Sequence, residues 1–215
     1  MCIRDSTYTV SHDLRAPLRA VDGYAAILGG DLGPGLPPEQ AQALQKIRDS
    51  AQRMGQLIDG LLAFAQRSRQ PLEKHEVDVE ALVRSVLAQA VPAGSGFELR
   101  VDRLPPCRAD AGALRQVWRN LLSNAVKFGG GAIHPVIHIG HTGGAYFVRD
   151  NGAGFDMAHA KSLFGVFSHT NSAGEYDGSG VGLAMVKRII ERHGGQVWAD
   201  SAPGQGATFY FTLAA

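Results

Sequence analysis

One histidine, His12, lies in a predicted helix beside a carboxylate that could orient its ring. Apolar residues recur from Val10 at spacings of three and four, which places them on one stripe of a helix, and His12 falls off that stripe. Asp13 can accept the Nδ1 proton of the imidazole, which leaves Nε2 as a nucleophile. Pro17 cannot bond the carbonyl of Asp13, so we expect the helix to bend there. Taken alone, these residues fit a surface histidine better than a catalytic one.

Two asparagines and a lysine share one face of a predicted helix. This helix runs from an Asp110 cap to about Phe128, with Asn120 and Asn124 four residues apart and Lys127 three residues further on. Amide oxygens suit Mg²⁺, which prefers hard ligands and keeps several waters beside nucleotide phosphates. The alternative is a polar stripe on a half-buried helix.

A third candidate is the turn that follows an apparent strand ending near Val148. The carboxylate of Asp150 is able to accept the exocyclic amine of adenine, and Gly152 and Gly154 let the backbone run close to a flat base. An ordinary Asp-Asn-Gly turn is the alternative.

A run of glycines precedes a helix that starts near Val181. Backbone N–H groups of Gly178, Gly180 and Gly182 at a helix N-terminus would bind phosphate oxygens. A dinucleotide-binding fingerprint is disfavoured because the preceding segment, 170–177, is polar and does not have the pattern of a strand. A P-loop is disfavoured because the glycines are not followed by Gly-Lys-Ser/Thr.

Four segments, in this order, resemble the sequence boxes of sensor histidine kinases, and the first is most similar to the phytochrome-like branch. They are SHDLRAPLRAVDGY (11–24), LRQVWRNLLSNAVKF (114–128), VRDNGAGFD (148–156) and DGSGVGLAMVKRII (177–190). The resemblance covers residues 10–213. It implies an autokinase that moves the γ-phosphate of ATP to His12 and then to an aspartate of a response-regulator receiver domain.

The resemblance also implies the roles of the binding residues. The asparagine at position 124 would hold Mg²⁺ with support from Asn120, Lys127 would approach the phosphates, and Asp150 would bind adenine. Residues 163–167 match the aromatic box of the family, with Phe164 and Phe167 equally suited to hinge core or ligand contact, and the stretch to Asp177 would form a mobile lid.

Two positions depart from the family pattern. Ala16 stands where many relatives carry Thr or Asn, which puts phosphatase activity in doubt. The lid has no Arg or Lys between Lys161 and Lys187, and a lost cation can cost orders of magnitude in rate. A protonated His169 is one candidate to replace it, with His169→Ala as the test.

The elements that must position these residues fall into two predicted domains. Residues 1–70 read as an all-α helical hairpin. The glycines and prolines of 29–38 separate its two helices, and the second helix carries a heptad seam, which predicts a dimeric four-helix bundle. Residues 71–76 form a predicted linker, and 77–215 an α+β Bergerat-type (GHKL) ATP-binding sandwich of helices on a mixed sheet. A hairpin that packs on its own chain is the alternative to the dimer. The predicted seams contain Leu14, Leu18, Val21, Ala25, Leu28, Leu44, Ile47, Ala51, Met54, Ile58, Leu61 and Ala65.

Within 77–215 the pattern predicts further helices and strands. Helices are expected at 79–90 and 181–193, and strands at 97–101, 137–140, 145–148, 196–199 and 208–213.

Composition limits the function classes. The chain has 215 residues and a formal net charge of +1, which disfavours a nucleic-acid partner or an anionic membrane surface. No apolar run reaches the roughly 20 residues of a membrane span, so no membrane contact is expected from this segment. Cys2 and Cys107 make no disulfide framework, which favours a cytoplasmic setting. The helical pattern starts so close to Met1 that a longer parent protein is expected.

Two other functions compete with the kinase. One is a GHKL-type ATPase, but such enzymes place a glutamate base where this chain has Asn120, and an amide cannot serve as that base. The other is a non-catalytic dimeric signalling module with a degenerate ATP lid.

Overall fold

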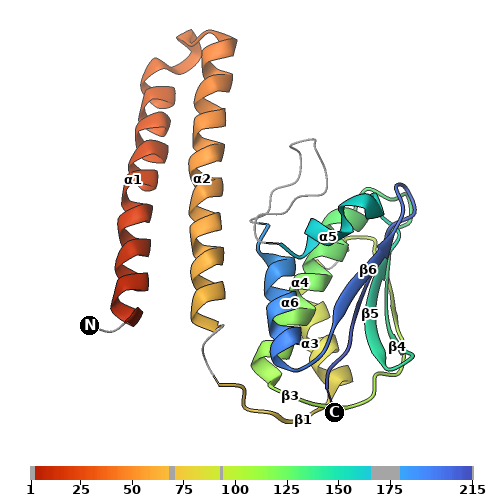
Figure 1. Cartoon of the computed structure of the whole chain (residues 1–215). Coiled ribbons are helices and arrows are strands. Elements are labelled where there is room, and N and C mark those ends of the chain that lie inside the picture. The colour runs from red at the N-terminus through yellow and green to blue at the C-terminus, as the bar shows by residue number, and fades with distance from the viewer. Residues whose placement is uncertain (1–2, 68–70, 93, 166–179, 215) are drawn as a thin grey trace. The chain divides into compact units, whose positions relative to one another are not determined.

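The computed structural model describes residues 3–67, 71–92, 94–165 and 180–214, which fall into two compact units (Figure 1). The first is a helical hairpin of residues 3–67. The second contains the remaining described residues and is an α+β domain. The side chains of residues 3–14 and 61–67 lie outside the description, although their backbone is helical. No helix in the described ranges combines the length and the apolar character that a membrane crossing requires.

The hairpin consists of α1 (Ile3–Leu32) and α2 (Pro38–Arg67), joined by a 3-10 turn, η1 (Gly33–Gly35). Both predicted helices are therefore confirmed. Helix α1 continues through two glycines and ends one residue before Gly33, whose φ of 48° leaves the helical region. Ala25 and Ala51 are buried, so small side chains fill the centre of the hairpin.

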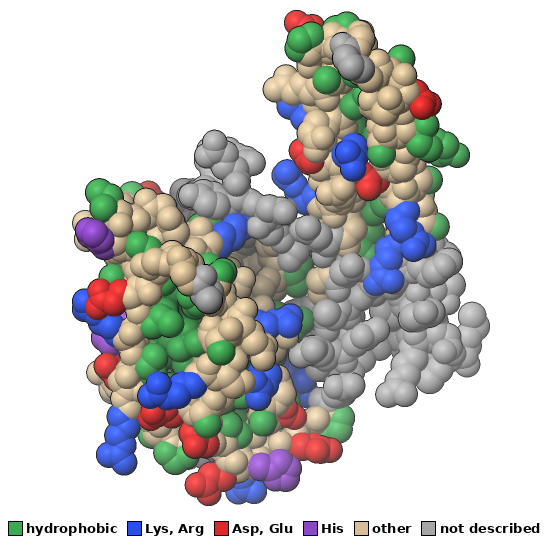
Figure 2. All heavy atoms as spheres, turned by 180° about the vertical axis from the view of Figure 1, so that it is seen from behind, with side chains coloured by type: hydrophobic (Ala, Val, Ile, Leu, Met, Phe, Trp, Pro, Cys, Tyr) green, Lys and Arg blue, Asp and Glu red, His purple; other side chains and the backbone are tan. Residues whose placement is uncertain are grey.

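Among the seam residues whose side chains the structure describes, four remain exposed in the single chain. The exposed fractions are 44% for Val21, 50% for Leu28, 46% for Ile47 and 44% for Met54. Figure 2 shows hydrophobic side chains on the surface of the hairpin. One hairpin therefore does not bury its own apolar stripes.

The second unit is one layer of helices on a mixed five-stranded sheet, as predicted. Helices α3 (Val79–Ala90), α4 (Ala111–Gly129) and α6 (Gly182–Arg192) lie on one face of the sheet (Figure 1). The strand order is β2-β4-β5-β7-β6, with β2 and β4 parallel and the other neighbours antiparallel. The strands are β2 (Glu98–Val101), β4 (Val136–Thr142), β5 (Ala145–Asp150), β6 (Val197–Ser201) and β7 (Ala207–Phe211).

The core of this unit lies between α4 and the centre of the sheet. The ring of Trp118 is fully buried and meets Tyr146 and Phe211 edge-on, at centroid distances of 5.9 and 5.1 Å. These contacts fix one face of α4 against the sheet, which leaves its other residues to form the site.

Four short elements escape the sequence pattern. Strand β1 (His75–Val77) pairs with β3 (Cys107–Ala109), and η2 (Met157–His159) leads into α5 (Ala160–Leu163). His75 and Glu76 were expected in the linker but form strand pairs with Ala109 and Arg108. Elements of three or four residues are too short to show a period, which is why the sequence did not reveal them.

Candidate nucleotide-binding site

Helix α4 presents the predicted magnesium and phosphate residues along the border of its buried face. Its N-cap is Asp110, whose carboxylate accepts a hydrogen bond of 2.9 Å from the Ala113 amide, as predicted. The side chains of Asn120, Asn124 and Lys127 are half-buried beside the apolar stripe. Because that stripe is held by the sheet, the three polar residues have a fixed orientation.

Asn120 joins α4 to the start of α6. Its Nδ2 donates to the carbonyl of Gly182 at 3.1 Å, and its Oδ1 accepts from Nε2 of Gln116 at 3.0 Å. The second and fourth sequence boxes, 62 residues apart at this contact, therefore meet as the resemblance implied.

Asn124 and Lys127 lie one and two turns further along α4. In the part of the chain that the structure describes, the Asn124 amide has no hydrogen-bond partner, so its oxygen is available to a ligand. The ammonium of Lys127 lies 5.0 Å from the centroid of the Phe128 ring, a cation–π contact.

Asp150 is the last residue of β5 and lies next to the C-terminal end of α4. Only 4% of the residue is exposed, and its Oδ1 accepts from the Gly152 amide at 3.0 Å. Burial raises the pKa of this carboxyl, although hydrogen bonds from the amides of Gly152 and Ala207 oppose the shift. A buried carboxylate that retains acceptor capacity suits recognition of an amine donor.

Gly152 and Gly154 pack against protein backbone, a reason for glycine that the sequence analysis did not give. A Cβ on Gly152 would lie 2.0 Å from the carbonyl oxygen of Phe128, and one on Gly154 would lie 2.1 Å from that of Ala202. Gly154 also has a φ of 61°. Glycine is required here because two chain segments touch. The close approach of this backbone to a flat base stays a prediction.

The glycines before α6 are described in part. Gly180 has a φ of 61°, and Gly182 is the first residue of the helix. Gly178, Phe167, His169 and the rest of the predicted lid lie outside the described residues.

The remaining predicted site residues are placed as follows. The backbone of His12 and Asp13 belongs to α1, but their side chains lie outside the description. Ala16 is exposed on the same helix, and Phe164 is half-buried after the buried Leu163.

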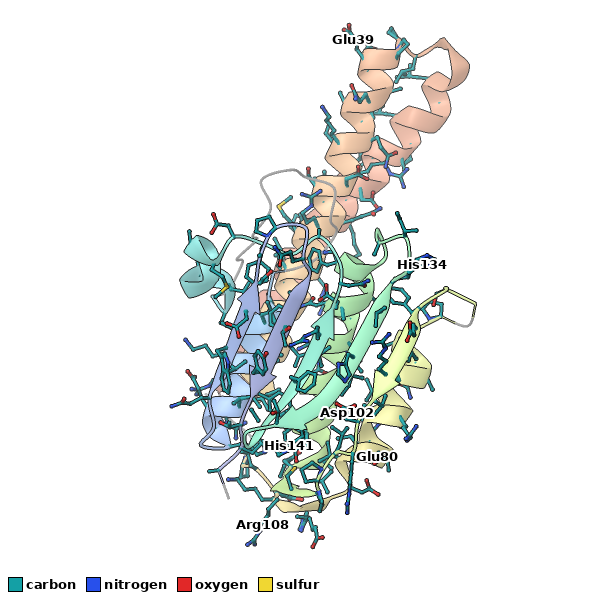
Figure 3. The ribbon with its side chains drawn as sticks, turned by 90° about the vertical axis from the view of Figure 1, so that its right-hand side faces the viewer. Glu39, Glu80, Asp102, Arg108, His134 and His141 are labelled. Carbon is teal, nitrogen blue, oxygen red and sulfur yellow. The ribbon has the colours of Figure 1, made fainter. Side chains whose placement is uncertain are left out.

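Asn151 is a bracing residue that sequence reasoning missed. Its Oδ1 accepts from the Val136 amide and its Nδ2 donates to the carbonyl of His134, both at 2.8 Å. Figure 3 shows His134 and His141 at opposite ends of β4, and the brace holds the His134 end beside Asp150. The Asp-Asn-Gly sequence signalled a turn but not this contact.

His193 joins the far ends of α4 and α6. The residue is 1% exposed, its Nδ1 donates to the Ile189 carbonyl at 2.8 Å, and its Nε2 accepts from the Asp110 amide at 3.1 Å. The Asp110 amide is a donor only, so the ring is neutral with its proton on Nδ1. Burial lowers the pKa of His193. His193 is therefore a structural histidine.

The fold and site together define a nucleotide-binding domain of the GHKL class. Residues 109–215 match the family model "Histidine kinase-, DNA gyrase B-, and HSP90-like ATPase", and residues 3–70 match "His Kinase A (phospho-acceptor) domain".

Individual relatives agree with both matches. The chain is 34% identical to cyanobacterial phytochrome B of Nostoc sp. over 96% of its own length and 28% of that protein, and 34% identical to the phytochrome-like protein Cph1 of Synechocystis sp. over 98% and 29%. Among solved structures, full-length ShkA in complex with AMPPNP matches 98% of this chain and 46% of that one, with 32% identity and a TM-score of 0.65.

The chain belongs to the sensor histidine kinases, and its relatives include the phytochrome-like branch. It spans less than a third of the length of these two phytochrome relatives.

Proposed function

We propose that this chain is a histidine autokinase that transfers the γ-phosphate of ATP to His12 and then to an aspartate of a response-regulator receiver domain. The observation that carries the proposal is the Asn120–Gly182 hydrogen bond of 3.1 Å, which brings the asparagine helix and the glycine segment together. A phosphoacceptor module accompanies this site in the same chain.

The residues of the second unit divide the binding of ATP among them. Asp150 accepts the amine of adenine, which guanine does not offer at that position. Lys127 and the backbone amides before α6 offset charge on the phosphates. Asn124 fits a magnesium ligand because its amide makes no hydrogen bond within the described residues. A magnesium ion held there, with Asn120 close by on α4, would neutralise charge on the phosphate oxygens.

The acceptor chemistry rests on the first sequence box. Nε2 of His12 attacks the γ-phosphorus in line, with Asp13 holding the Nδ1 proton, and ADP leaves. The phosphoryl group then passes from the imidazole to an aspartate oxygen of the receiver domain, which returns His12 to its starting state. We place the phosphoacceptor hairpin in residues 1–70, the linker in 71–76 with its last two residues in β1, and the ATP-binding domain in 77–215, in a cytoplasmic setting.

The hairpin acts as a homodimer in this proposal. Support comes from the seam residues Val21, Leu28, Ile47 and Met54, which are 44–50% exposed in one chain. Two hairpins would bury these stripes in a four-helix bundle, since exposed apolar stripes of this length are rare on monomers.

Labelled ATP tests the proposal. We expect acid-labile, base-stable label that is lost in His12→Gln and kept in His75→Gln, a control at an exposed histidine of β1. Release of free phosphate without labelled protein would indicate a GHKL-type ATPase instead. Neither product, with intact folding, would indicate a non-catalytic signalling module.

A further inference from the structure

Gln116 is the first member of a hydrogen-bond relay. It lies in the second sequence box, but the sequence analysis gave it no functional role. Its Nε2 donates to Oδ1 of Asn120, one turn further along α4, at 3.0 Å. The Nδ2 of Asn120 then donates to the carbonyl of Gly182 at 3.1 Å. The relay therefore runs from the middle of α4 to the first residue of α6.

The backbone carbonyl fixes the direction of both amides. A carbonyl oxygen can only accept, so the atom of Asn120 that faces Gly182 must be the NH₂ group. Its oxygen then faces Gln116, which must donate. If Gln116 lost its donor, the Asn120 amide would keep only the hydrogen bond to Gly182, and it would hold that carbonyl less firmly.

The far end of the relay is the part of α6 nearest the phosphates in the proposed function. The N-cap residue Val181 provides no side-chain hydrogen bond, so α6 begins without a capping side chain. Gly180 just before it has a φ of 61°. The contact with Asn120 is a side-chain anchor for this helix start.

We propose that Gln116 is a positioning residue: through Asn120 it holds the start of α6 against α4, so that the amides before α6 face the phosphates. This rests on the proposed nucleotide site. It assigns Asn120 to holding Gly182, and leaves the magnesium contact to Asn124.

Nucleotide affinity, measured by calorimetry with a non-hydrolysable ATP analogue in magnesium and in EDTA, tests the relay. Gln116→Met removes the donor without adding charge, and loss of one such hydrogen bond predicts an affinity reduced by about 3- to 10-fold. Asn120→Asp should weaken binding similarly, because a carboxylate facing the Gly182 carbonyl repels it. Both reductions should be the same with and without magnesium. Asn124→Ala, the matched control, should weaken binding only with magnesium.

Hydrogen exchange in the nucleotide-free protein provides an independent readout. Amides of residues 180–185 should exchange faster in Gln116→Met and Asn120→Asp, and at the wild-type rate in Asn124→Ala. If wild-type protein bound no nucleotide, the proposed function would fail, while this exchange test would still decide on the relay. Wild-type exchange and affinity in Gln116→Met would overturn the proposal, and so would an Asn120→Asp defect that appears only with magnesium.

Discussion

Gly152→Ala is the substitution whose consequence follows most directly from the geometry of the site. The added Cβ would lie 2.0 Å from the carbonyl oxygen of Phe128, 2.5 Å from its carbonyl carbon and 2.7 Å from Cα of Gly129. The same carbonyl accepts a hydrogen bond of 3.3 Å from the Ala153 amide. These three nearest atoms all belong to the backbone, so the contact cannot be relieved by rotation of a side chain.

The magnitude follows from the displacement required. Close C···O contacts settle near 3.3 Å or more, so the turn and the end of α4 must separate by about 1.3 Å. Overpacking costs about 1–3 kcal/mol or more, and we expect the upper end of that range, about 3 kcal/mol. For a unit of this size the melting temperature should fall by roughly 10 °C. A shift of about 1 Å between Asp150 and Asn124 should also slow autophosphorylation by about 100-fold.

Calorimetric unfolding of wild type, Gly152→Ala and Gly131→Ala measures the effect. Gly131 follows α4 in the same region and has nothing within 4 Å of an added Cβ, so its substitution should change stability by less than about 0.5 kcal/mol. A Gly152→Ala protein that melts within a degree or two of the control would refute the reasoning, because the close backbone contact would then be easily relieved.

Three other perturbations have defined outcomes. Asp150→Asn should abolish binding of an ATP analogue without lowering the melting temperature, because burial disfavours the charged carboxylate, raising its pKa, whereas a neutral amide carries no such cost. A variant that loses binding and also melts at a lower temperature would show a structural role for Asp150. Burial lowers the pKa of His193, so the unfolded chain binds its proton first and stability is lost as the pH falls below about 6.5 towards the folded-state pKa. The midpoint of urea unfolding should thus drop between pH 8 and pH 5.5, and the drop should shrink in His193→Gln; an equal drop in the variant would assign it to other groups. Ile47→Asp should convert a dimer to a monomer in analytical ultracentrifugation, whereas Gln45→Glu on the exposed surface of α2 should leave it unchanged; a dimeric Ile47→Asp protein would exclude this seam.

The sequence alone predicted the elements that depend on local periodicity and capping. The two hairpin helices, the Asp110 cap of α4, and the strands β4 and β5 are found where expected, within a few residues. Each depends on residues close together in the chain, so their pattern is visible without the fold. The family resemblance added the order of the boxes and the expectation that they meet.

Only the tertiary structure decided which atoms these residues contact. The sequence gives no sign that Gln116 acts through Asn120 on Gly182, which lies 62 residues from Asn120 in the chain. Nor does it show that His193 accepts a hydrogen bond from the Asp110 amide, 83 residues away. The glycines at 152 and 154 indicated that something approaches the backbone closely, but a glycine in the sequence does not show which atoms these are. Sequence therefore determined the longer helices and strands and the chemical groups, because these depend on local interactions. Their packing determined the roles, because hydrogen bonds and close contacts between distant segments exist only once the chain has folded.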